Sequence, residues 1–226
     1  MTVKYADAPP LATLLAALLV ACSSNPPQPD WQMTAQSAIE RATAAYMVGN
    51  AIVEKGEFQR ARSELASTGK VELVIRAELI RCASRVAALV FEDCPGYAAL
   101  QQDATPADRA YAAYLAGHAT AQDAQLLPAP QQAVAAANTD AAAAAAVQAI
   151  ADPLSKLVAS GVLMRTGRAS PEVLDGAVNA ASEQGWRRPL LAWLGVQAMR
   201  AGQAGDAAEE QRIKRRIALV SAPERE

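Results

Sequence analysis

The chain contains few of the residues that build most catalytic and metal sites. Its 226 residues include three cysteines and one histidine, and aromatic residues make up 4%. A catalytic or metal-binding histidine needs a carboxylate, a serine or a second ligand held beside it, and the nearest candidate for His118 is the distant Asp123. His118 directly follows Gly117, an expected helix stop, where a histidine interacts favourably with the carbonyl end of the helix. We therefore predict no catalytic residue, no metal site and no cofactor.

Paired carboxylates for acid–base chemistry also leave no signal in the sequence. Ser67 to Lys70 (STGK) matches the loose S-x-x-K pattern of penicillin-binding enzymes, but it straddles an expected helix stop at Gly69 and lacks the companion motifs. We interpret that match as accidental. The acidic residues are interpreted as solvated surface, and they include Glu72, Glu78, Glu92, Asp93, Asp108 and Asp175.

A strong excess of charge of one sign is missing as well. Lysine and arginine number 21 against 23 acidic residues, which gives a formal net charge of −2. A chain so close to neutrality offers no electrostatic basis for binding nucleic acid and no broad basic face for anionic lipid. We expect no nucleic-acid partner.

Sustained alternation of apolar and polar residues, the pattern of half-buried strands, is absent. The prolines of the body can all stand at helix starts or in linkers. The sequence therefore predicts an all-α fold of antiparallel helical hairpins, arranged as an α-solenoid or an irregular bundle. The expected helices are 32–54, 57–67, 71–91, 105–117, 138–151, 153–166, 171–184, 189–201 and 204–219.

The long apolar run of a membrane-spanning helix is missing too, because Leu11 to Ala21 is shorter than the roughly 20 residues that a span needs. The run fits the apolar core of a secretory signal. It ends in Leu19-Val20-Ala21-Cys22, which resembles the lipobox of bacterial lipoprotein precursors. The resemblance implies that residues 1–21 are a cleaved signal peptide and that acyl chains on Cys22 insert into a bilayer. Ser23 after the cysteine implies the periplasmic side of the outer membrane in a Gram-negative cell; an ordinary signal with a chance cysteine is the alternative.

Residues 22–31 form a proline-rich linker that would hold the body away from the bilayer. The body, residues 32–226, is predicted to be one all-α domain or two lobes, 32–117 and 139–220, joined by a flexible connection over 118–138. In an oxidising periplasm the two remaining cysteines, Cys82 and Cys94, are expected to form a disulfide across a tight reversal; two buried free thiols are the alternative.

Two stretches, "VGNAIVEKGEFQRARSEL" and "LGVQAMRAGQAGDAAEEQ", share one spacing of small residues. Gly161 also lies one tetratricopeptide period of 34 residues before Gly195. The pattern resembles tetratricopeptide and Sel1-like helical hairpins, although other residues stand at the tryptophan and tyrosine positions of that motif. Chance glycine spacing in a helical protein is the alternative. The shared spacing joins Gly49, Gly56 and Ala61 in the first stretch to Gly195, Gly202 and Ala207 in the second.

Trp186, Arg187, Arg188 and Trp193 cluster around a proline, and tryptophan and arginine are enriched at binding hot spots. They are candidates for a partner surface, or else the tryptophans close a helical-hairpin core. Taken together, the sequence favours a non-enzymatic lipoprotein that acts as a protein-interaction adaptor or assembly scaffold for an envelope protein, as the tetratricopeptide resemblance implies. A cell-wall-active envelope enzyme and a purely structural spacer remain the alternatives.

Overall fold

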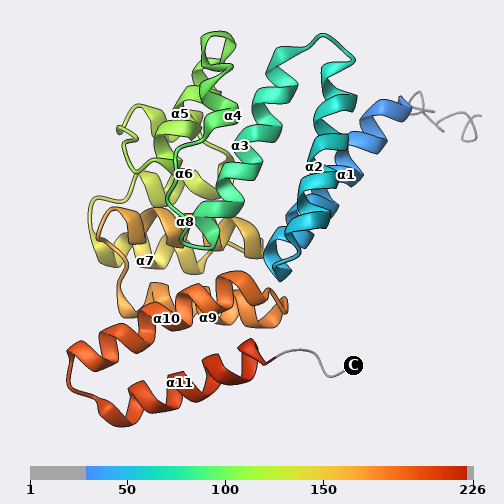
Figure 1. Ribbon diagram of the computed structural model, residues 1–226. Helices are drawn as coiled ribbons and strands as arrows, with labels where there is room; N and C mark the ends of the chain where they lie inside the picture. The colour runs from blue at the N-terminus through green and yellow to red at the C-terminus, as the bar shows by residue number, and fades with distance from the viewer. Residues whose placement is uncertain (1–28, 223–226) are drawn as a thin grey trace, which may run out of the picture.

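The computed structural model describes residues 29–222, and every regular element in that range is a helix. The predicted all-α class is therefore confirmed, in a form compatible with either a bundle or a solenoid (Figure 1). The signal peptide, Cys22 and most of the linker lie outside the described residues. The helices are α1 (Asp30–Val48), α2 (Ala51–Ala66), α3 (Val71–Ala87), α4 (Pro95–Ala98), η2 (Gln101–Asp103), α5 (Pro106–Leu115), η3 (Asp123–Leu126), α6 (Ala129–Ala135), α7 (Asp140–Gln148), α8 (Pro153–Arg165), α9 (Pro171–Glu183), α10 (Arg187–Gln203) and α11 (Ala207–Ser221).

The first hairpin differs from the prediction of one helix over 32–54. Gly49 adopts a left-handed conformation with φ of +93° and ends α1, which a residue with a side chain would do only with strain. Asn50 then caps α2, because its side-chain oxygen accepts a hydrogen bond from the Val53 amide at 3.1 Å. The chain therefore reverses at Gly49, and α1 and α2 pack antiparallel.

Helix α3 runs through the middle of the upper part of the molecule, with the α1–α2 hairpin on one side and α4 and α5 on the other (Figure 1). It ends earlier than the predicted residue 91, because Leu89 takes a left-handed φ of +59° and its successor Val90 bonds back to the Arg85 carbonyl at 2.9 Å. Glycine is the usual residue at such a helix end. Here the Leu89 side chain packs against the core instead, which offsets the strain.

Residues 118–138, expected to be a flexible connection, are folded. They contain η3 and α6, and Leu127 and Val134 are buried in the main core. Gln131 is buried too: its side-chain oxygen accepts from the Tyr114 hydroxyl at 2.9 Å, and its side-chain nitrogen donates to the Ser155 carbonyl at 3.1 Å. This segment binds α5 to α8 and does not separate two lobes.

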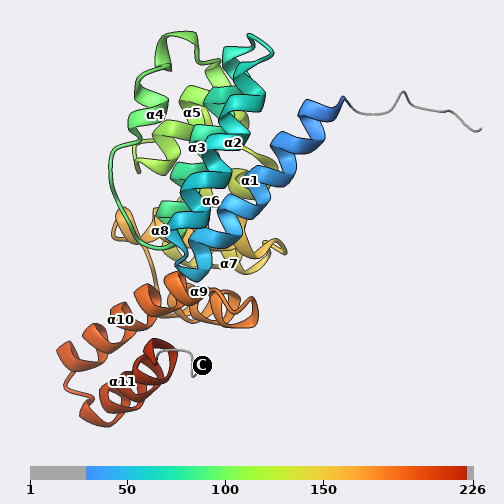
Figure 2. The same ribbon diagram turned by 45° about the vertical axis from the view of Figure 1, so that its right-hand side comes forward.

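The C-terminal helices begin close to the predicted residues. The Asp152 carboxylate accepts from the Ser155 amide at 2.7 Å at the start of α8, and Pro171 opens α9. Helices α10 and α11 form the last antiparallel hairpin, at the lower edge of both views (Figures 1 and 2). Helix α10 also contacts α1, which links the end of the chain to its beginning.

One hydrophobic cluster extends from Tyr46 in α1 to Ile213 in α11, and a smaller one lies between α1, α2 and α3. Helix α8 is central, since all of its residues from Leu157 to Leu163 are buried. It approaches α3 so closely that a Cβ on Gly161 would collide with the backbone carbonyl of Val86. None of the helices within 29–222 has the length and apolar character that crossing a membrane requires.

The shared glycine spacing does not mark equivalent positions in two hairpins. Gly49 ends α1, whereas its counterpart Gly195 lies inside α10. The left-handed glycine between α10 and α11 is Gly205, at φ of +76°. The spacing is therefore not a structural repeat, although the two stretches lie in the antiparallel hairpins α1–α2 and α10–α11.

Candidate functional site

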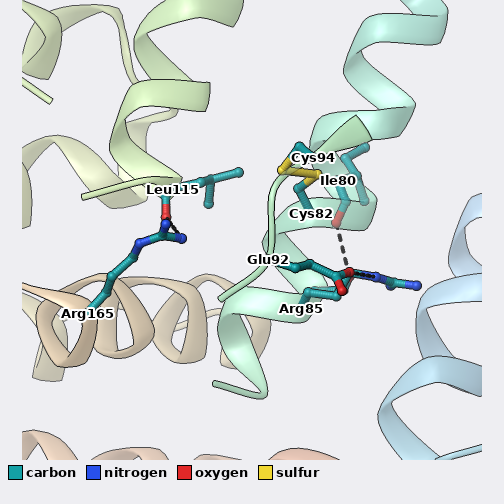
Figure 3. Close-up of a disulfide and its surroundings, with 8 residues drawn as sticks. Ile80, Cys82, Arg85, Glu92, Cys94, Leu115 and Arg165 are labelled. Atoms are coloured by element: carbon teal, nitrogen blue, oxygen red, sulfur yellow. Dashed lines mark hydrogen bonds and ion pairs between the residues drawn. A yellow bond between two sulfur atoms is a disulfide. The ribbon is translucent and has the colours of Figure 1, made fainter. Parts of the chain in front are cut away.

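The structure joins Cys82 to Cys94, with their Cα atoms 5.9 Å apart, which fits the expected disulfide. Cys82 lies on α3 and Cys94 immediately precedes the short helix α4, so the bond fastens the loop between α3 and α4 against α3 (Figure 3). Glu92 in that loop reaches back to α3, where its carboxylate accepts from Arg85 Nε at 3.0 Å. The loop is therefore held by a covalent bond and an ion pair.

Arg85 also joins a buried polar network between α1, α2 and α3. The Glu54 carboxylate, 6% exposed, accepts from Arg85 Nη2 at 3.1 Å and from Arg81 Nε at 2.9 Å. Burial by itself would raise the pKa of Glu54, but the Arg81 hydrogen bond and the Arg85 charge outweigh it and leave that pKa lowered. The carboxylate is thus held ionised, as in a structural ion pair.

The same network attaches α10 to α1. The guanidinium groups of Arg85 and Arg188 each lie 4.4 Å from the ring centre of Tyr46, an arrangement that favours cation–π attraction. Arg188 Nε also donates to the Tyr46 carbonyl at 2.7 Å, near the carbonyl end of α1. Burial raises the pKa of the Tyr46 phenol, even though both arginines favour its ionised form. Arg188 is therefore committed to an internal contact.

The other three residues of the predicted partner surface, Trp186, Arg187 and Trp193, differ in how deeply they are buried. Trp193 is 0% exposed and donates from Nε1 to the Ala87 carbonyl at 3.0 Å, so it closes the core between α3 and α10 and offers no exposed surface. Trp186 is partly buried against that core. Arg187 donates to the Ser221 carbonyl of α11 at 3.4 Å. These four side chains form no common exposed patch, and the core alternative describes Trp193 correctly.

Two acidic residues that were interpreted as solvated surface are buried. Glu78 accepts from Arg62 Nε at 3.0 Å. Asp108 forms a capping box with Thr105 at the start of α5, and its carboxylate lies 3.9 Å from Arg76 Nε. Glu78 gave no signal in the sequence because its partner Arg62 lies on another helix. For Asp108, the spacing from Thr105 is that of a capping box, and this local signal could have identified it.

The sequence matches to catalytic patterns do not assemble into a site. His118 is exposed, and its backbone amide bonds to the Ala113 carbonyl at the end of α5. The Asp123 carboxylate accepts from the Thr120 amide and hydroxyl at 2.7 and 2.8 Å instead. Ser67 stands at the end of α2, not at a helix start, and its hydroxyl donates to the Glu64 carbonyl. Over residues 29–222, no group of three or more His, Cys, Asp or Glu side chains is placed to hold a metal ion.

An apolar groove of about 420 Å³ lies at the surface between α3, α5 and the η3–α6 segment. Two large apolar side chains at this groove are exposed, Ile80 at 37% and Leu126 at 45%. Arg76 and Asp108 add charge at its edge. The groove gave no signal in the sequence, because its walls come from three separate segments, residues 76–80, 107–111 and 126–128. Its lining is completed by Leu79, Ala107, Tyr111, Leu127 and Pro128.

No family model, no curated protein and no solved structure matches this chain.

Proposed function

We propose that this protein is a lipid-anchored adaptor of the cell envelope, whose helical body binds an apolar segment of a partner protein in the groove between α3, α5 and η3–α6. The observation that carries the proposal is the groove itself, with Ile80 and Leu126 exposed beside it. Apolar pockets with a few polar groups at the edge are the usual form of a binding site. A mobile anchor would bring this surface to partners along the membrane.

The support for the lipid anchor comes from the sequence alone. Cys22 follows a signal-like apolar run and precedes a proline-rich linker, and Ser23 favours the periplasmic face of the outer membrane. Acyl chains on Cys22 would supply the membrane attachment, because two lipid chains give stable anchoring where one is marginal. The disulfide between Cys82 and Cys94 fits an oxidising compartment of this kind.

The buried carboxylates favour binding over acid–base catalysis. Glu54 and Glu78 are each paired with arginine, and Asp108 caps its own helix. A general acid at neutral pH needs a raised pKa, whereas the pKa of Glu54 is lowered. These carboxylates stabilise the packing of α2, α3 and α5.

The test compares two charge insertions at exposed apolar residues. Ile80→Glu places a carboxylate in the groove, and Met199→Glu is the matched control, because Met199 is 51% exposed on α10 and lies outside the groove lining. Proteins are crosslinked in cells, the chain is purified, and its partners are identified by mass spectrometry. We expect one envelope protein to be recovered with the wild type and Met199→Glu, and lost with Ile80→Glu.

If both variants keep the wild-type melting temperature and recover the partner protein equally well, binding of the partner in the groove would be refuted. Absence of any partner would favour the structural spacer. The same samples test the anchor, since the first peptide of the mature chain must begin at Cys22 and carry the mass of its acyl chains. An unmodified peptide that continues through Cys22 would refute the lipid anchor independently of the groove.

A further inference from the structure

A second hollow of about 320 Å³ lies beside the disulfide and shares no lining residue with the groove. Its size is within the range of about 300–1,000 Å³ that is typical of small-molecule sites. The disulfide and α3 form one wall, and Tyr97 and α5 form others. Most of the lining is apolar, with Val86, Ala98, Ala112, Leu115 and Ala116 among its members.

Arg165 is the one cation of this cavity that has no carboxylate within ion-pair distance in the part of the chain that the structure describes. It rises from the end of α8, opposite the disulfide (Figure 3). Its Nη1 donates to the Leu115 carbonyl over a long 3.4 Å, and its guanidinium lies 5.5 Å from the Phe91 ring centre. These contacts hold the side chain in place and leave most of its donors free.

The other charged side chains that line the cavity either form ion pairs within the protein or are exposed to solvent. Glu92 is occupied by Arg85, whose guanidinium is directed toward Glu54 and Tyr46. Asp93 is exposed to solvent, where water screens its charge. The lining therefore presents an apolar surface and two sets of donors: those of Arg165, and the buried Nη1 of Arg85, which has no hydrogen-bond partner among the described residues.

We propose that this cavity binds a small molecule with an apolar body and a single carboxylate, and that Arg165 receives the carboxylate. A guanidinium matches the two oxygens of a carboxylate with two parallel hydrogen bonds, which makes such pairs strong and directional. The apolar body lies against Val86, Leu115 and the disulfide. This site is independent of the proposed partner groove, and its failure would leave the groove untouched.

The test uses calorimetric titration of the full-length chain carrying Cys22→Ala, so that no lipid or detergent competes for the probe. The probes are octanoate, its neutral analogue octanol and its cationic analogue octylamine. We expect octanoate to bind at least tenfold more tightly than either analogue. Arg165→Gln should remove this preference, because it removes the charge and keeps a side chain of similar shape.

Arg168→Gln is the matched control, since Arg168 lies outside the cavity and pairs with Asp140 at 2.8 Å. It should leave octanoate binding unchanged. Ala112→Leu fills the cavity and should weaken both octanoate and octanol, with the fold checked by the melting temperature and by intact mass for the disulfide. Failure to detect octanoate binding at millimolar concentration would overturn the proposal. Equal affinity for octanoate and octylamine, or an octanoate affinity unaffected by Arg165→Gln, would overturn it as well.

Discussion

The close approach of α3 and α8 makes Gly161 a position where an added methyl group should destabilise the protein. A Cβ there would lie 2.9 Å from Val86 Cγ1 and would also collide with the Val86 carbonyl oxygen. The backbone of α3 cannot rotate away as a flexible side chain can, so the two helices must separate. Overpacking a core typically costs about 1–3 kcal/mol, and the contact with backbone places this case near the upper end.

Alanine also forms helix better than glycine by about 1 kcal/mol, which partly compensates the clash. We therefore expect Gly161→Ala to lower the free energy of unfolding by about 2 kcal/mol, or the melting temperature by about 4–8 °C. Gly195→Ala is the matched control: Gly195 also lies inside a helix, α10, and a Cβ there meets nothing within 4 Å. That variant should gain about 0.5–1 kcal/mol.

Urea unfolding followed by far-ultraviolet circular dichroism measures both variants against the wild type. The free energies of unfolding of the two variants should differ by about 3 kcal/mol. Because both substitutions gain the same helix propensity, this difference reports the clash at Gly161. If Gly161→Ala stabilised the protein as Gly195→Ala does, the contact between α3 and α8 would be wrong.

Three further substitutions test the packing, the ion pairs and the disulfide. Trp193→Ala removes a fully buried side chain and its hydrogen bond to Ala87, and should cost about 3–5 kcal/mol in urea unfolding. Folding lowers the pKa of Glu54 from its ordinary value of 4.5. The ionised carboxylate therefore stabilises the native state at pH values above 4.5, and this stabilisation is lost as the pH falls below that value. Glu54→Gln should therefore be less stable at pH 7 and lose less stability on acidification, and parallel pH–stability curves for variant and wild type would contradict this. Cys94→Ser removes the disulfide to Cys82, 12 residues earlier in the chain, and should lower the free energy of unfolding by about 3 kcal/mol. Amide hydrogen exchange should become faster only in the α3–α4 loop, and faster exchange throughout the chain would refute this local role.

The sequence predicted best those features whose causes are local. Thr105, Asp152 and Pro171 begin helices where the sequence places them, because capping oxygens and a proline in the first turn act within three or four residues. The disulfide was expected on other grounds, because Cys82 and Cys94 are the two cysteines that remain after Cys22 and an oxidising compartment favours their pairing.

The errors concern residues whose role depends on distant partners. Gly49 was placed inside a helix predicted over 32–54, whereas it ends α1; the close approach of two helices is made at Gly161, against a helix 75 residues earlier in the chain. Glu78 was placed at the surface because its partner arginine stands 16 residues away on another helix. Val134 lies in an alanine- and glutamine-rich segment whose low side-chain volume hid its place in the core.

The candidate groove was beyond sequence analysis for the same reason. Ile80 belongs to a helix that is apolar on several faces, so its exposure could not be separated from the burial of Leu79 beside it. Leu126 stands in a segment that was expected to be flexible. Only the packing of α5 against α3, and of η3 against α5, brings the two side chains to one surface.

The central claim is that a partner occupies this groove, and photocrosslinking from Leu126 in living cells tests it most directly. A photoreactive amino acid at position 126, beside the groove, is compared with one at Leu219, which is 78% exposed on α11 and lies outside the groove lining. The account predicts one discrete crosslinked envelope protein from position 126, absent from position 219 and abolished by adding Ile80→Glu. No discrete product from position 126, or the same product from both positions, would contradict it.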